Sequence, residues 1–140
     1  LTRKHAVLMA FVTTTLCSMP PAARDQSLLA VFALIRMFET HYGSNYKPIV
    51  EADITQMLNR NGRLITDTAK GVLAQNPGDI VQPYVLQFVL DLAFDFEEDA
   101  MPDAHNAFSM LMVLKTTVDL LDRAYAASQK PAKFALAARA

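Results

Sequence analysis

The sequence predicts an all-α protein, a single domain over residues 1–140 in which six or seven helices form a bundle around a central apolar helix at about 80–96. Apolar residues recur at spacings of three and four through most of the chain, whereas the alternation typical of strands is scarce. Hydrophobic residues make up 52% of the 140 residues, which is enough for a sizeable core. Prolines and glycines separate the periodic segments, where they end helices.

The first helix is expected at about 2–18, because an apolar run there stops at the Pro-Pro pair of residues 20–21. Basic residues at 3–5 precede this run, as they do in a secretory signal peptide. Residues 1–19 are therefore expected either to dock on the bundle as a separate helix or to be a retained targeting or membrane-surface segment. The run is shorter than the ~20 residues of a membrane span, so membrane contact is expected only through this helix.

Three further helices are predicted from their boundaries. One begins near Asp25 and ends at HYGSN, with its apolar residues on one face. The next begins at Pro48, which suits the first position of a helix, and closes at the Asn61-Gly62 pair. A shorter helix, LITDTAKGVLAQN, is weakened by Gly71 and ends at NPGD.

The segment QPYVLQFVLDLAF is apolar over most of a helical circumference. Gln87, Asp91 and Asp95 lie four apart and form one polar stripe, while apolar residues occupy nearly every other position. A helix of this kind is normally enclosed by its neighbours, and it is too short to span a bilayer unaided. The sequence therefore places residues 80–96 at the centre of the bundle.

The last long helix is predicted from about Asp103 to Ala127, with an apolar stripe at the three-four spacing and a second apolar ridge beside it. This width indicates contact with more than one neighbour, or with one neighbour and a partner molecule. Residues 128–140, which include Pro131, are expected to form a tail that adds a final turn or frays.

A cluster of acids joins the last two predicted helices. The acids are Asp95, Glu97, Glu98 and Asp99. Because carboxylates oppose the dipole at a helix C-terminus, we expect this cluster to mark a junction, with Asp99 or Asp103 capping the last helix. A calcium loop of the EF-hand kind would need Gly at position 100 and Glu at position 106, where the chain has Ala and Asn.

The sequence contains no catalytic constellation and no cofactor or metal motif that we recognise. Cys17 is the single cysteine, which excludes an internal disulfide and a cysteine-based zinc site. The Glu-x-x-His spacing of carboxylate-bridged metal sites in helical bundles does not occur. The 13 basic and 14 acidic residues nearly balance, so the basic surface of a nucleic-acid binder is missing.

We therefore expect a non-enzymatic interaction subunit or adaptor that binds another protein, or a second copy of itself, through apolar surface on the first and last helices. The residues expected at this surface are Val7, Leu8, Phe11, Met101, Met110, Met112, Asp95, Glu97, Glu98 and Asp99. The acids would bias partner choice by charge. The alternatives are a carrier with a small molecule or lipid in its cavity, and a metal-dependent enzyme that uses residues 95–103. A cytoplasmic location is favoured over targeting by residues 1–19.

Overall fold

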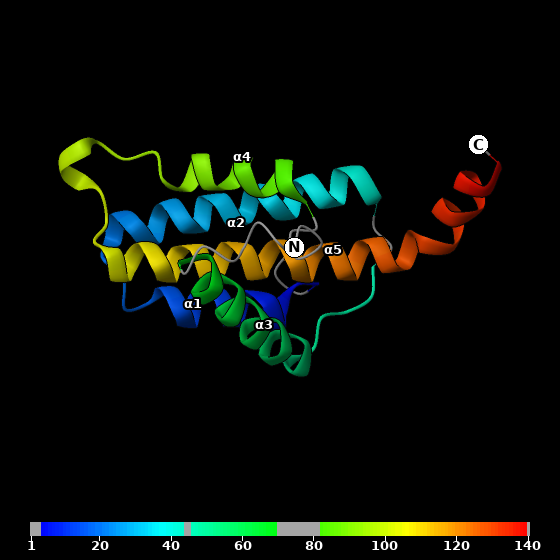
Figure 1. Cartoon of the computed structure of the whole chain (residues 1–140), viewed down its shortest axis with the longest axis horizontal. Helices are drawn as coiled ribbons and strands as arrows, with labels where there is room; N and C mark the ends of the chain where they lie inside the picture. The colour runs from blue at the N-terminus through cyan, green and yellow to red at the C-terminus, as the bar shows by residue number, and fades with distance from the viewer. Residues whose placement is uncertain (1–3, 44–45, 70–81, 140) are drawn as a thin grey trace.

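A computed structural model describes residues 4–43, 46–69 and 82–139 (Figure 1). Its elements are α1 (Ala6–Leu16), α2 (Pro21–Tyr42), α3 (Glu51–Ala69), α4 (Pro83–Ala93), the short 3-10 helix η3 (Glu98–Ala100) and α5 (Ala104–Arg139). The described residues contain no strand, which confirms the all-α prediction. The predicted six or seven helices are too many for this part of the chain, which has five α-helices.

Helix α5 is the axis of the fold and packs against each of the other four α-helices. Figure 1 shows α2 and α4 side by side on one flank of α5, with α1 and α3 on the opposite flank. Every residue of α5 from Val113 to Leu121 is buried, including its polar ones. α5 therefore holds the central position that the sequence analysis assigned to residues 80–96.

Helix α4 lies at the edge of the bundle, so the prediction of a central helix at 80–96 is wrong for its described part. Val89 and Ala93 are the buried residues of α4, whereas Tyr84 is 90% exposed and Phe88 is 50% exposed. The physical reason is that α4 packs mainly on α2 and α5, which cover only one of its faces. An apolar circumference is a weak predictor of enclosure, because more than half of a folded protein's surface is apolar.

Helix α3 continues through Asn61 and Gly62, where the sequence predicted the end of one helix and the start of another. Its buried stripe consists of Ile54, Met57, Asn61 and Leu64, at the spacing of one helical face. Packing of this stripe against α5 outweighs the cost of about 1 kcal/mol for a glycine inside a helix. The remainder of the predicted fourth helix, including NPGD, lies outside the described residues.

Helices α1 and α2 follow the predicted boundaries closely. α1 falls within the expected range 2–18, and α2 begins at Pro21, four residues before the expected Asp25. Proline is favoured at a first helical position because that position needs no backbone donor. Gly43 ends α2 with a φ of 82°, a left-handed conformation that glycine adopts without strain.

Helix α5 extends beyond its predicted end near residue 127. It continues through Pro131 to Arg139, so the segment 128–140, expected as a tail, is helical as far as Arg139. Figure 1 shows this end turning away from the rest of the helix axis. A proline inside a helix produces such a bend, because it lacks a backbone N–H and its ring crowds the preceding turn.

Candidate functional site

An open groove with a volume of about 500 Å³ lies between α1 and α3. One wall consists of Ala6, Val7, Ala10, Phe11, Thr14 and Thr15 from α1, and the other of Glu51, Ile54 and Thr55 from α3. Glu51 is the one charged residue among the described residues that line it. The groove is therefore mainly apolar, with a single carboxylate.

The groove exists because α1 is enclosed along one stripe only. Leu8, Val12 and Leu16 are spaced by four and are fully buried. Val7 and Phe11, also four apart, lie on the neighbouring stripe and are half-buried, so they face the groove. No residue between Ala6 and Leu16 carries a charge, so most of the groove wall is uncharged although it is open to solvent.

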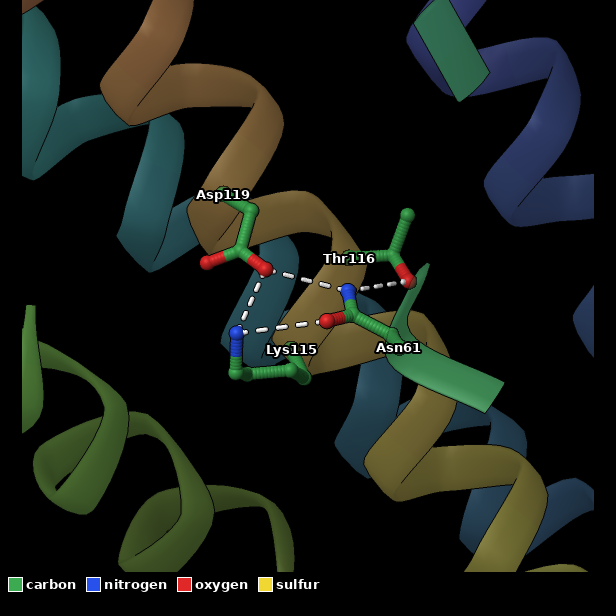
Figure 2. A network of polar contacts seen from close by, with 4 residues as sticks. All are labelled: Asn61, Lys115, Thr116 and Asp119. Atoms are coloured by element: carbon green, nitrogen blue, oxygen red, sulfur yellow. Dashed lines mark hydrogen bonds and ion pairs between the residues drawn. The ribbon is translucent and has the colours of Figure 1, made fainter. Parts of the chain in front are cut away.

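Four polar side chains meet inside the core between α3 and α5, as Figure 2 shows. Asn61 comes from α3, and Lys115, Thr116 and Asp119 come from α5; none is more than 3% exposed. Lys115 Nζ donates to Asp119 Oδ2 at 2.5 Å and to Asn61 Oδ1 at 3.3 Å. Asn61 Nδ2 donates to Asp119 Oδ2 at 3.0 Å and to Thr116 Oγ1 at 3.2 Å. We call this set the α3–α5 polar network.

The α3–α5 polar network fixes how α3 lies on α5. A buried ion pair needs further hydrogen bonds, and the Asn61 amide on the facing helix supplies one to Lys115 and one to Asp119 Oδ2, whereas Asp119 Oδ1 has no partner among the described residues. Sliding α3 along α5 would separate these partners, so the network holds one wall of the groove in place. These residues were not predicted from the sequence. The signal that could have found them is a Lys and an Asp four apart in a helix whose neighbouring apolar residues lie on more than one stripe.

A second buried polar cluster, the His5 cluster, holds the start of α1. His5 is 2% exposed, and its Nε2 lies 3.2 Å from Glu39 Oε1 on α2 and 3.3 Å from the Tyr125 hydroxyl on α5. Its Nδ1 has no hydrogen-bond partner among the described residues. Burial lowers the pKa of His5 below its usual value, against the opposing influence of Glu39. Burial also raises the pKa of Tyr125 to about 12.

Aromatic rings and one lysine complete the His5 cluster. The Tyr46 ring lies 5.2 Å from the His5 ring and 5.2 Å from the Tyr125 ring, measured between centroids. Lys4 Nζ lies 4.5 Å from the centre of the Tyr46 ring, and the Tyr46 hydroxyl donates to the Lys4 carbonyl. The residues before α1 are thereby held by α2, by α5 and by the segment that precedes α3.

The structure brings together some of the residues predicted to bind a partner and separates others. Val7 and Phe11 share the groove, whereas Leu8 and Met110 are fully buried in the core. Met112 is half-buried and Met101 is 49% exposed. Figure 1 shows the turn that leads into α5 at one end of the molecule, and no residue of this turn, which includes Met101, lines the groove.

The acids of residues 95–103, the acidic corner, are exposed, and one of them caps α5. The exposed acids are Asp95, Glu97, Glu98 and Asp99. Asp103 caps α5, because its Oδ1 accepts a hydrogen bond of 2.8 Å from the backbone N–H of Asn106. The capping expected from the sequence thus occurs at Asp103.

Within residues 4–43, 46–69 and 82–139, no three His, Cys, Asp or Glu side chains are grouped so that they could hold a metal ion. In the same part of the chain, no helix has both the length and the apolar character needed to cross a membrane. No protein-family model, curated protein or solved structure matches the chain.

Proposed function

We propose that the chain is a non-enzymatic interaction subunit that binds one helix of a partner protein in the groove between α1 and α3. The observation that supports this most directly is the uncovered face of α1. This helix has no charged side chain, yet Ala6 and Ala10 are exposed and Val7 and Phe11 are only half-buried. Helices without a charged face are normally covered on most sides.

The shape and chemistry of the groove favour a helical occupant. Two helices form its walls, and the small side chains of Ala6 and Ala10 let a third helix come close. Apolar residues of that helix at i, i+3 or i+4, and i+7 would meet Val7, Phe11 and Ile54. Glu51 favours a Lys or Arg on the partner, since opposite charges at a rim select partners.

Other occupants fit the groove less well. A carrier encloses most of its ligand, whereas this groove is open to solvent. Helices that bind membrane surfaces carry Lys or Arg on their polar face, and α1 has neither while Glu51 adds a negative charge beside it. These features favour a protein helix as the occupant.

The test uses synthetic helical peptides, because the partner is identified only by its chemistry. We expect a fluorescent peptide with a stripe of Leu and a row of Lys to bind saturably, and its counterpart with Glu in place of Lys to bind more weakly. Ala10→Leu fills the groove and should weaken binding of the Lys peptide at least tenfold, which corresponds to about 1.4 kcal/mol. Ala22→Leu is the matched control, because Ala22 is exposed on α2 outside the groove.

Further measurements distinguish a partner helix from the other possible occupants of the groove. Glu51→Lys should reverse the preference between the two peptides if the charge of Glu51 selects the partner. If light scattering shows a dimer that Ala10→Leu converts to a monomer, the occupant of the groove is a second copy of this chain and not a helix of another protein. If the wild type sediments with phosphatidylglycerol vesicles and Ala10→Leu does not, the groove binds a membrane surface. If neither peptide binds, the proposal fails.

A further inference from the structure

We infer that His5 is a pH-sensitive latch, which holds the start of α1 against α2 and α5 and releases it when the ring is protonated. His5 directly precedes α1, and its carbonyl accepts a hydrogen bond of 2.8 Å from the Met9 backbone N–H in the first turn. The groove wall begins at the next residue, Ala6. The effect on partner binding rests on the proposed function, whereas the release of α1 does not.

The neutral ring of His5 fits its surroundings. With its proton on Nε2, it donates to Glu39 Oε1 at 3.2 Å, and its buried Nδ1 is an acceptor without a partner among the described residues. The other neutral form would bury an unpartnered donor on Nδ1 and place two acceptors, Nε2 and the Glu39 oxygen, against each other. The contact with Glu39 therefore selects the Nε2 proton.

A second proton does not fit in the same position. It would turn Nδ1 into a buried donor with no described acceptor and place a positive charge where the ring has no contact with water. The charged and titratable groups that face the ring are Lys4 from its own segment, Glu39 from α2, Tyr46 from the segment before α3, and Tyr125 from α5. Glu39 alone among them favours the cation, and burial outweighs it.

The direction of the pH effect follows from this balance. An unfolded or released His5 has a pKa of about 6.5, whereas burial lowers the pKa of the latched ring. As the pH falls below about 6.5, the released state therefore binds more protons, and the latch loses stability. Above that pH its contribution is complete. Leaving the site requires the ring to move into water, and the first turn of α1 must move with it.

Amide hydrogen exchange, corrected for intrinsic rates, tests the release at about pH 7.5 and about pH 5.5. We expect protection of α1 in the wild type to fall at the lower pH relative to protection of α5. His5→Gln can still donate to Glu39 but cannot take up a proton, so its α1 protection should not change between the two values. His105→Gln, at an exposed position of α5, should behave like the wild type.

Two results would overturn the latch. One is the same loss of α1 protection in the wild type and in His5→Gln. The other, which needs no variant to fold, is an NMR titration in which the wild-type His5 ring takes up its proton at the ordinary value while α1 stays protected.

Binding of the Lys peptide then separates the latch from the proposed function. If one tenth of the molecules keep α1 in place at about pH 5.5, the apparent Kd rises about tenfold in the wild type and stays constant in His5→Gln. If α1 is released as expected but the peptide does not bind at about pH 7.5, the proposed function fails and the latch stands. If the peptide binds but exchange of α1 does not depend on His5, the latch fails and the proposed function stands.

Discussion

Helices α4 and α5 differ in burial in the direction opposite to the one that their compositions suggest. α4 is apolar over most of its circumference, yet Tyr84 and Phe88 face solvent and only one stripe is buried. α5 carries Lys115 and Asp119 in its middle, yet it is enclosed on every side there. The helix that looks central from its composition is at the edge, and the one with charges in its sequence is at the centre.

The comparison shows that the arrangement of neighbours decides burial more than the composition of a helix does. Four helices surround α5, so each of its polar groups must find a partner within the protein. Lys115 and Asp119 Oδ2 meet this requirement because they lie one turn apart and because Asn61 of α3 reaches both, whereas the buried Asp119 Oδ1 has no hydrogen-bond partner among the described residues. α4 packs mainly on α2 and α5, so the face that carries Gln87 and Asp91 stays open to solvent.

Asp119→Ala disrupts the α3–α5 polar network at the centre of the molecule and should cause the largest loss of stability. The substitution removes the carboxylate that faces Lys115 and accepts from Asn61, inside a core from which water is excluded. Removing one partner of a buried ion pair costs about 3–5 kcal/mol. Urea unfolding followed by circular dichroism measures the loss. Asp122→Ala is the control on the same helix, because Asp122 is only partly buried and accepts one hydrogen bond from Gln82.

Replacing Asn61, Lys115 and Asp119 together separates the stability of the network from its specificity. The triple variant Asn61→Leu, Lys115→Met, Asp119→Leu leaves no buried charge and, of the four network residues, keeps only Thr116, so its unfolding free energy should equal or exceed that of the wild type by up to about 4 kcal/mol. We expect α3 to lose its fixed position on α5, which would broaden the NMR signals of α3. A triple variant as unstable as Asp119→Ala would show that the ion pair itself holds the fold.

Val89→Asp tests the edge position of α4. Val89 is fully buried, so the substitution forfeits about 1.5–3 kcal/mol of burial. Phe88→Asp, one position away, should cost about 1 kcal/mol or less, because Phe88 is already 50% exposed. A helix at the centre of the bundle would show no such contrast between neighbours. Equal losses of stability in the two variants would contradict the edge position.

The sequence predicted the structural features that depend on residues close together in the chain. It did not predict those that depend on contacts between residues far apart in the chain. The helical periods, the end of α2 at HYGSN and the capping of α5 by Asp103 depend on residues a few positions apart. The His5 cluster joins residues separated by 34 and 120 positions, so no local pattern predicts it. Locally, His5 resembled the basic start of a signal peptide.

The same distinction explains the errors in helix count and in the central helix. Asn61 followed by Gly62 is a good helix end in isolation, but the bonds of Asn61 to α5 make it an interior residue of α3. Val7 and Phe11 were predicted as binding residues because the first helix is strongly apolar; both line the groove, and their role in binding stays a prediction. The position of α3, which forms the other wall, depends on the α3–α5 polar network, which the sequence analysis missed.

Calcium or magnesium should have the smallest effect, at the acidic corner that joins α4 to α5. The corner is rich in carboxylates, but they are exposed, and Asp103 is engaged as a helix cap. A site whose Kd lies tenfold below the cation concentration would add about 1.4 kcal/mol of stability. For a chain of this size that would raise the Tm by about 3–6 °C.

We expect millimolar calcium or magnesium to leave the Tm within about 1 °C, because exposed carboxylates that do not converge do not provide the several oxygen ligands that would replace the water bound to the cation. Scanning calorimetry of the wild type beside the double variant Asp95→Asn, Asp99→Asn provides the measurement, with sodium chloride at equal ionic strength as the control for screening. A rise of several degrees with either cation, lost in the double variant, would mean that the carboxylates converge on a metal in solution. In that case the junction would be a binding site in its own right, and α4 would owe its position at the edge to the metal as well as to its packing on α2 and α5.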